Sequence, residues 1–400
     1  MLKKISVQDV RLGMFIDELC GSWMDHPFWK KAFMLDSEKD LHALKTSGID
    51  ELWIDLAKGL DVEIKPAPLV KEEAAATLPE EVESLKKLER QLALHEEIPR
   101  AQKLHAKAKR IVAFVFREAR MGNALQLTEA VALVDEIIQS VSRNSGALLS
   151  LSRLKNRDDH IYLHSVAVSA LMIVLGRQMG MEGDTLRILG MAGLFHDVGK
   201  VMIPDNILNK PGKLTAGEFE IVKTHSRRGW EILKSDPDVD GVVLDVCLHH
   251  HERVDGTGYP DQLLGESLSL YARMAAVCDV YDALTSDCSY RKAFSPPDAI
   301  HKMTEWQNGH FDKVVFHALV KAVGIYPSGT LVKLKSGRLA VVADQSAKSL
   351  LTPIVKVFFS TKTNEPIFPA LVDLSKIPDS IASVEDPAEW KLDLKTMAGI

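Results

Sequence analysis

Histidine is concentrated in one part of this chain. Seven of the 14 histidines fall between His160 and His251, within a chain of 400 residues. They stand on or at the ends of apolar segments with helical periodicity, such as VAVSALMIVLG after His164 and RILGMAGLF before His196. Apolar helices that carry imidazoles at their ends or on their inner faces can bring them together in a bundle core. The pattern therefore predicts a helical bundle with a polar cluster inside it.

The spaced polar groups of this region combine nitrogen and oxygen ligands. They are His164, His196, Asp197, His225, His250, His251 and Asp279. Imidazole nitrogen mixed with carboxylate oxygen, without thiolate, suits iron, manganese, zinc, nickel or cobalt and does not suit a structural zinc knot. A lone histidine is usually an ordinary core or surface residue, but a His-Asp pair plus a triple-histidine run is hard to bury without a metal. We therefore expect these side chains to bind metal.

The adjacent pair His196-Asp197 has a specific chemical use. Its carboxylate can bridge two metals through its two oxygens while the imidazole binds one of them. Two metals about 3.5–4 Å apart hold a bridging hydroxide and clamp both oxygens of an in-line phosphoryl displacement. Lys200 lies three residues after Asp197, where its ammonium can neutralise a phosphate oxygen if the intervening residues make a turn.

A second element follows the triple histidine, in the sequence HHHERVDGTGYP at 249–260. Asp255-Gly256 indicates a turn, and Gly258 permits backbone geometry that a side chain would block. Pro260 fixes the exit, so that Tyr259 would be presented from the turn, free to stack or to hydrogen-bond. Taken alone, the segment is also compatible with a simple loop that ends a helix.

Composition excludes several classes of protein. An apolar content of 46% rules out wholesale disorder, and a net charge of −6 argues against a protein that coats nucleic acid. A local basic pocket for one nucleotide remains open, and we interpret the basic run KLHAKAKR at 103–110 as a solvated helix face. The four cysteines form no CxxC pair, so neither a disulfide framework nor a thiolate zinc site is expected. No stretch reaches the roughly 18 apolar residues of a spanning helix, and the N-terminus lacks a signal-peptide core. We expect no membrane span and a cytoplasmic location.

Four parts are expected along the chain. Residues 1–65 alternate short strands with one helix and predict a small α/β domain. Residues 66–145 begin as a linker rich in Pro, Ala and charge and continue as a helical connector, with two helices after Pro99. Residues 146–325 form the helical domain that carries the histidines. Residues 326–400 predict short β-strands and thus a β-rich C-terminal extension.

Three long motifs, in this order, resemble the HD-GYP family. They are HDVGKVMIPDNILNKPGKLT from His196, HHHERVDGTGYP from His249 and AAVCDVYDALTSD from Ala275. The resemblance covers about residues 155–325, and the first 60 or so residues are similar to an uncharacterised small domain that often precedes HD-GYP domains. It implies a mainly α protein, in which an all-helical HD-type metal-binding bundle is joined to a small α/β N-terminal domain and a short β-rich C-terminal extension.

The resemblance also implies an activity. Members of the family are cyclic di-GMP phosphodiesterases of bacterial second-messenger signalling, which acts on motility and biofilm formation. They hydrolyse cyclic di-GMP to pGpG or onward to GMP, by in-line attack of a metal-bridging hydroxide at a centre of two or three metals. Iron and manganese are the metals expected first, with nickel, cobalt and zinc as alternatives. The implied partners are cyclic di-GMP as substrate and diguanylate cyclase (GGDEF) proteins, with no nucleic-acid polymer, and a homodimer is compatible with the family.

Roles carry over residue by residue. The family's metal ligands match His164, His196, Asp197, His225, His250, His251 and Asp279. Asp197 would bridge the metals and Lys200, the lysine of the HDxGK run, would touch phosphate. Gly258-Tyr259-Pro260 is the GYP signature beside the substrate. His249 precedes the family's usual histidine pair, and we interpret it as an extra histidine that faces solvent or lies outside the ligands.

The chain departs from the family at two positions. Where members commonly read D-R-P-Y-R, this sequence has Asp287-Cys288-Ser289-Tyr290-Arg291. Cys288 removes one phosphate-binding cation, which predicts weaker substrate binding, while Arg291 remains as an expected substrate contact. His160 occupies the place where three-metal members carry a glutamate. It lies one helical turn before His164 on the same face, so its imidazole would serve a third ion, unless it only begins the helix at the surface.

Two rival functions stay open at this point. One is an HD-class hydrolase that acts on another nucleotide, because the metal chemistry is shared; the GYP loop argues against it. The other is a catalytically weak sensor that binds nucleotide and signals through the N-terminal domain. Cys288 supports the sensor, whereas the intact set of ligands argues for an enzyme.

Overall fold

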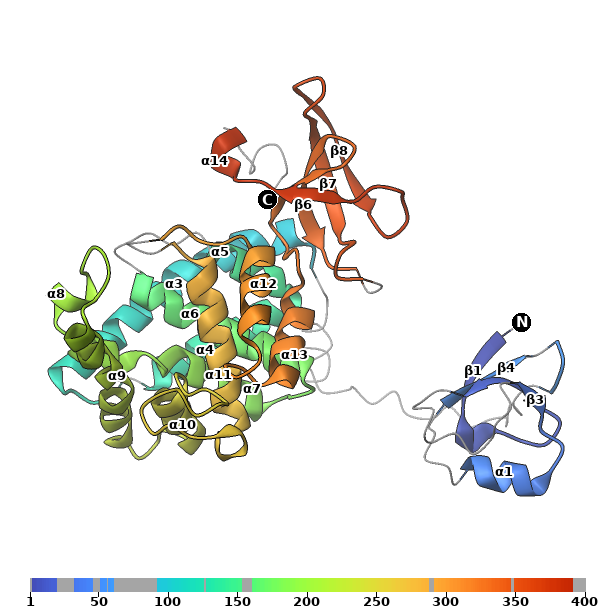
Figure 1. The fold of residues 1–400 in the computed structure, drawn as a ribbon, viewed down its shortest axis with the longest axis horizontal. Helices are drawn as coiled ribbons and strands as arrows, with labels where there is room; N and C mark the ends of the chain where they lie inside the picture. Colours follow the sequence, from blue (N-terminus) through green and yellow to red (C-terminus); the bar gives the residue numbers. More distant parts are fainter. Residues whose placement is uncertain are drawn as a thin grey trace, which may run out of the picture. The chain divides into compact units, whose positions relative to one another are not determined.

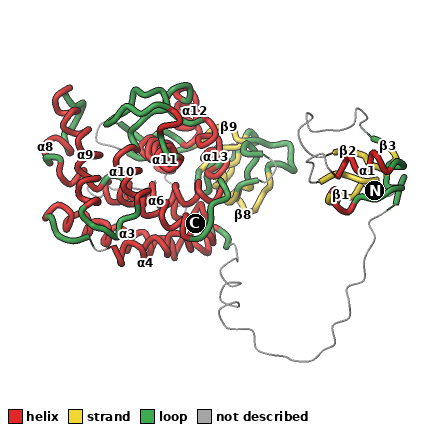
Figure 2. Tube along the Cα trace, turned by 90° about the horizontal axis from the view of Figure 1, so that it is seen from below, coloured by secondary structure: helices red, strands yellow, loops and turns green. Residues whose placement is uncertain are grey.

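The computed structural model describes residues 2–19, 32–45, 51–55, 57–60, 92–125, 127–152, 160–287, 291–346 and 349–390. The chain divides into two compact units, Met1–Thr77 and Leu78–Ile400, and each is described by itself. Helices predominate in the second unit, while strands occur near the two ends of the chain (Figures 1 and 2). The mainly α fold class expected from the sequence is confirmed.

In its described residues the N-terminal unit is a small antiparallel sheet with a helix. Its elements are β1 (Leu2–Ser6), the 3₁₀ turn η1 (Val7–Asp9), β2 (Phe15–Leu19), β3 (Phe33–Met34), α1 (Glu38–Lys45) and β4 (Glu51–Asp55). The strands lie in the order β1-β4-β2-β3. Ile16 and Ile54 of the sheet and Leu44 of α1 are fully buried and form the centre of a separate apolar core. The strands and the helix expected here are therefore present.

The second unit is built mainly from helices (Figure 1). In chain order these are α3 (Leu94–Met121), α4 (Leu127–Arg143), α5 (Ser145–Ser152), α6 (His160–Gln178), α7 (Asp184–Phe195), α8 (Asp205–Leu208), α9 (Ala216–Lys234), α10 (Gly241–His249), α11 (Leu270–Thr285), α12 (Pro296–Trp306) and α13 (Lys313–Val323). In the described connections, 3₁₀ turns occur at η4 (Val198–Met202) and η5 (Gly265–Ser267).

Helix α6 is the central helix of this bundle. Every residue from Leu163 to Gly176 is buried, and α6 packs against α7, α11 and α3. By length and composition α6 would also pass for a membrane span, which corrects the expectation that no stretch of the chain does so. However, 78% of the window Ile161–Gln178 is buried within the protein. An apolar helix enclosed on all sides in this way is the core helix of a helical domain.

The helices expected as a separate connector belong to this same bundle. Side chains of α3 and α4, among them Val112 and Leu133, share one apolar core with α6, α7 and α11. The boundary expected at residue 145 is therefore not a boundary between compact units. Helix α3 also begins at Leu94 and contains Pro99, whereas it was expected to begin after that proline. Pro99 is the sixth residue of the helix, beyond its first turn, and because proline has no N–H the helix lacks the backbone hydrogen bond that this position would give to the carbonyl oxygen of His95.

The C-terminal strands form one antiparallel sheet. They are β5 (Leu331–Leu334), β6 (Arg338–Asp344), β7 (Ile354–Ser360), β8 (Glu365–Asp373) and β9 (Ile381–Val384), followed by the short helix α14 (Pro387–Trp390). Their order is β8-β7-β6-β5-β9. The β-rich extension expected from the sequence is thus present; β9 was not foreseen. It pairs with β5, with Val332 opposite Val384.

A buried ion pair joins α3 to α4, and removing it tests whether the two helices belong to the same core. Glu97 is fully buried and accepts hydrogen bonds from Ser140 Oγ (2.9 Å) and from two nitrogens of Arg143 (both 2.7 Å). Glu97→Ala leaves Arg143 without its carboxylate, so we expect the free energy of unfolding to fall by about 3 kcal/mol in denaturant titration. The matched control is Glu136→Ala, which removes the solvent-exposed pair Lys107–Glu136 between the same helices and should cost at most about 1 kcal/mol. Equal losses in both variants would contradict a shared core.

Candidate metal centre

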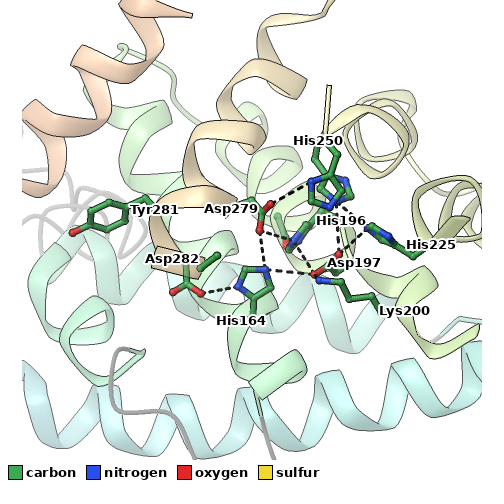
Figure 3. A network of polar contacts seen from close by, with 12 residues as sticks. His164, His196, Asp197, Lys200, His225, His250, Asp279, Tyr281 and Asp282 are labelled. Carbon is green, nitrogen blue, oxygen red and sulfur yellow. Dashed lines mark hydrogen bonds and ion pairs between the residues drawn. The ribbon is translucent and has the colours of Figure 1, made fainter. Parts of the chain in front are cut away.

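The seven predicted ligands converge in the bundle, and Figure 3 labels all of them except His251. They come from five helices and one turn: His164 from α6, His196 and Asp197 from the junction of α7 and η4, His225 from α9, His250 and His251 from the end of α10, and Asp279 from α11. All are buried except His251, whose side chain is 25% exposed. The cluster is therefore closed on its inner side and opens at His251.

The carboxylate of Asp197 lies at the centre of the cluster. Its Oδ2 is 3.4 Å from the Nε2 atoms of both His164 and His196. Its Oδ1 is 3.2 Å from His225 Nε2 and 3.6 Å from His250 Nε2. The two oxygens of one carboxylate thus face two different pairs of imidazoles. Two groups of potential ligands that share Asp197 are the arrangement required to bridge a pair of metal ions.

A second carboxylate completes the cluster. Asp279 Oδ1 is 3.0 Å from His164 Nε2 and 3.8 Å from His196 Nε2. These are the same two imidazoles that Asp197 Oδ2 faces. Its Oδ2 is 3.7 Å from His251 Nδ1. Asp279 therefore adds an oxygen ligand to one imidazole pair and reaches toward the exposed edge of the cluster with the other oxygen.

Outer hydrogen bonds set the orientation of four imidazoles. Nδ1 of His196, His225 and His250 lies within 2.8, 2.7 and 3.1 Å of the carbonyl oxygens of Gly193, Val222 and Cys247, each three residues earlier in its own helical turn. Nδ1 of His164 is 2.6 Å from Asp282 Oδ2. A carbonyl or carboxylate oxygen can only accept, so each Nδ1 carries a proton and Nε2 is the ring atom left to bind a metal. The four Nε2 atoms all lie near the carboxylate of Asp197.

The inner atoms of the cluster fit metal ions. Among the described residues, His196 Nε2 and Asp197 Oδ1 find no hydrogen-bond partner although both are buried. Nε2 of His225 and Nε2 of His250 face each other at 3.3 Å, each with a lone pair. Buried acceptors without donors are costly, and a cation satisfies several of them at once. Imidazole and carboxylate donors suit a borderline transition metal.

The electrostatics of the cluster agree with this interpretation. Burial works against charge on Asp197, but Lys200 and His196 outweigh it and hold the pKa of Asp197 well below its usual range. Burial lowers the pKa of His250 to about 4, which keeps that imidazole neutral and able to bind a metal. Burial also lowers the pKa of His196, yet Asp197 and Asp279 raise it to about 10. In the absence of metal the two carboxylates thus draw a proton onto His196, the position that a metal ion would take.

A close backbone approach brings the HDVGK turn to α9. A Cβ atom on Gly199 would lie 2.0 Å from the carbonyl oxygen of His225 and 2.5 Å from the nitrogen of Gly229. Only glycine, which has no Cβ atom, allows the backbone of η4 to lie this close to α9. The contact helps to set Asp197 Oδ1 at 3.2 Å from His225 Nε2. The same turn carries Lys200, whose ammonium contacts Asp197 Oδ2.

The GYP loop is held by the buried carboxylate of Glu252. Its oxygens accept backbone N–H groups of Asp261 (2.6 Å), Gln262 (2.8 Å) and Leu263 (3.2 Å). A Cβ on Gly258 would lie 2.4 Å from Glu252 Cα, so glycine is required there as well. The loop therefore folds back on the residue that follows His251. This places the ring of Tyr259 4.8 Å from the ring of His251, at the open edge of the cluster.

The remaining predicted residues have different outcomes. The Arg291 guanidinium donates to the carbonyl oxygens of Ala283 (2.7 Å) and Leu284 (3.4 Å) in the last turn of α11, and its contact with phosphate stays a prediction. Cys288 and the side chain of His160 lie outside the described residues. His249 is not solvent-facing: its Nδ1 bonds Asp245 Oδ1 at 2.7 Å, and its Nε2 bonds Asp261 Oδ2 in the GYP loop at 3.2 Å.

The sequence patterns did not point to two further carboxylates near the site. Asp282 orients His164, and Glu252 anchors the GYP loop. A signal for Asp282 was available, because it follows Asp279 by three residues and so lies on the same face of a helix. Glu252 carried no comparable signal, since its three partners are backbone groups about ten positions later and depend on how the loop closes.

Buried histidines and aspartates that come from several helices and share one bridging carboxylate define the class of HD-type metal-dependent phosphohydrolases. Comparisons with known proteins agree. A family model for the HD domain matches residues 149–315, and a model for a domain of unknown function (DUF3391) matches residues 2–130. The second match extends through α3 into α4, beyond the end of the N-terminal compact unit at Thr77.

Curated relatives are similar over different lengths. A cyclic di-GMP phosphodiesterase of Pseudomonas aeruginosa is 53% identical over 393 residues, which are 98% of this chain and 94% of that protein. A cyclic di-GMP phosphodiesterase response regulator of Xanthomonas campestris is 35% identical over 51% of this chain and 57% of its own length. A cyclic di-GMP phosphodiesterase of Vibrio cholerae is 34% identical over 52% of this chain and 45% of its own. The chain belongs to the HD-GYP family of HD-domain phosphodiesterases, as its motifs indicated.

The contact between Asp282 and His164 predicts a measurable effect on metal affinity. Carboxylates that orient a ligating imidazole typically contribute 10- to 100-fold in affinity, so Asp282→Asn should weaken binding of manganese or iron(II) to metal-stripped protein by about that factor. Asp245→Asn is the matched control, because it removes a carboxylate–imidazole bond at His249, which is not one of the seven ligands. Calorimetric titration measures both. Unchanged affinity in Asp282→Asn would show that Asp282 does not support His164 as a metal ligand.

Proposed function

We propose that this chain hydrolyses cyclic di-GMP, a cyclic dinucleotide with two phosphodiester bonds, to pGpG or onward to GMP. The observation that carries the proposal is the position of Asp197, whose two oxygens each face a separate pair of buried imidazoles. Two adjacent metal sites joined by one carboxylate suit phosphodiester hydrolysis. The names of the curated relatives support cyclic di-GMP as the substrate.

Different residues of the chain would have different roles in the reaction. When bound, the metals would activate water and neutralise charge on the phosphate. His164, His196, His225, His250, His251, Asp197 and Asp279 would hold them. Lys200 contacts Asp197 and is partly exposed, so its ammonium can pass from the carboxylate to a phosphate oxygen of the substrate. Tyr259 covers His251 and limits where the substrate enters.

The identity and number of the metals belong to the proposal as well. Imidazole with carboxylate favours iron or manganese here, and nickel, cobalt and zinc accept the same donors. Five imidazoles and two carboxylates suffice for two ions, and His160 decides whether a third is held. A cytoplasmic location, a homodimer, diguanylate cyclase partners and a phosphate contact by Arg291 stay predictions from the resemblance.

The bridging role of Asp197 predicts a loss of turnover. Asp197→Ala should reduce kcat for cyclic di-GMP in the presence of manganese by at least about a hundredfold, because it removes the shared ligand of both ions. Turnover is followed by chromatography of pGpG and GMP, with metal content measured in parallel. Asp135→Ala is the control, since it removes an aspartate that pairs with Arg187 and is not one of the seven ligands. Near-normal turnover in Asp197→Ala would refute the shared-ligand mechanism.

His160 predicts the metal count. If its imidazole serves a third ion one helical turn from His164, His160→Ala should lower bound metal from about three to about two ions per chain, and conversion of pGpG to GMP should suffer most. Elemental analysis of wild type and variant after identical loading gives the answer. The same count in both proteins would remove His160 from the ligands.

A further inference from the structure

A series of aromatic contacts leads from the metal centre to an exposed ring. The ring of His251 lies 4.8 Å from that of Tyr259, and Tyr259 lies 6.5 Å from the ring of Phe219 in an edge-to-face arrangement. Phe219 belongs to α9, six residues before the ligand His225, and is 45% exposed. A large apolar ring is thus presented to solvent beside the open edge of the cluster.

A cation accompanies these rings. The Lys223 ammonium lies 5.0 Å from the centroid of the Phe219 ring and 5.7 Å from that of Tyr259. Both distances are in the range of a cation–π contact, which holds the ammonium beside the aromatic pair. Its carboxylate partner on the same helix, Glu220, is 2.7 Å away and largely exposed, so the ion pair between them is weak and open to exchange.

These features match the part of the proposed substrate that the metal centre leaves unbound. A cyclic dinucleotide carries two purine bases and two phosphates, and the ligand cluster engages only the phosphate under attack. Proteins bind nucleobases in a sequence-tolerant way by stacking them on exposed aromatic rings, with basic side chains next to the phosphates. One exposed ring and one ammonium beside the catalytic edge supply both requirements.

We propose that Phe219 and Lys223 form a nucleotide subsite beside the metal centre. A guanine base stacks on the exposed part of the Phe219 ring, and the Lys223 ammonium leaves Glu220 to bind the second phosphate. Tyr259 links this subsite to His251. The inference rests on the proposed function, because it assumes a cyclic dinucleotide as the substrate. It assigns binding to both residues and no part in bond breaking.

The test compares two substrates on the manganese-loaded full chain. One is cyclic di-GMP, and the other is bis(p-nitrophenyl) phosphate, a phosphodiester without bases or a second phosphate. We expect Phe219→Ala to raise KM for cyclic di-GMP about tenfold, within the range that loss of one stacked base produces, with a smaller change in kcat. Lys223→Ala should raise the same KM, and Lys223→Arg should restore it. The simple diester should be cleaved as by wild type.

Controls come from the same helix. Lys234 lies 4.3 Å from the centroid of the Trp230 ring at the other end of α9, so Lys234→Ala removes a cation–π contact outside the subsite. It should leave both substrates unaffected. Phe219→Leu keeps an apolar side chain but removes the ring. If Phe219→Ala loses metal, Phe219→Leu replaces it in the test and should still raise the KM for cyclic di-GMP.

The outcomes separate the two proposals. Wild-type KM for cyclic di-GMP in Phe219→Ala, Phe219→Leu and Lys223→Ala overturns the subsite and leaves the proposed function standing. Equal losses on both substrates would assign Phe219 and Lys223 to the metal centre and also overturn the subsite. A wild-type protein that cleaves the simple diester and leaves cyclic di-GMP intact overturns the proposed function, and the subsite with it.

Discussion

Burial of two ionised carboxylates is the constraint on which the catalytic unit depends. Asp197 and Asp279 lie inside a helical core, where an unpaired charge costs several kcal/mol even after the protein relaxes. Lys200 and the surrounding imidazoles compensate this cost in part. The remaining acceptor atoms point at one another, which an apolar core would not tolerate. Bound cations would satisfy these acceptor atoms. Five helices of the bundle supply the nitrogen and oxygen atoms that could bind them.

The helices that carry the imidazoles set the positions of these rings. The rings of His196, His225 and His250 are each fixed to a carbonyl oxygen in the preceding turn, so the local helix backbone sets the direction of Nε2. Positions of rigid elements are better defined than those of loops, which suits ligands that must meet within a few tenths of an ångström. His164 differs, because it takes its orientation from Asp282 on another helix. The orientation of the His164 ring therefore depends on how α6 and α11 are positioned relative to each other.

The sequence alone points to the seven proposed ligands because their chemistry is local. The His-Asp pair, the histidine run and Asp279 are recognisable by residue type and by their place on apolar helical segments, and the β-strands after residue 326 by their apolar runs and turns. What the sequence did not show depends on distant contacts. Glu97 joins α3 to Arg143 on α4 across 46 residues, which makes the expected connector part of the core. The outer partners of the ligands likewise depend on how helices pack.

A single peptide bond joins the exposed edge of the cluster to the GYP loop. His251 is one of the seven proposed ligands, and the next residue, Glu252, holds the GYP loop by three backbone N–H groups. Tyr259 returns from that loop to donate its N–H to the carbonyl oxygen of His251, at 3.3 Å. A shift of the loop must therefore move the most exposed ligand of the cluster, and a change at His251 must move the loop. The open edge of the site is the place where binding of a large, flexible dinucleotide can act on the metal ligands, while the inner ligands stay fixed by their helices.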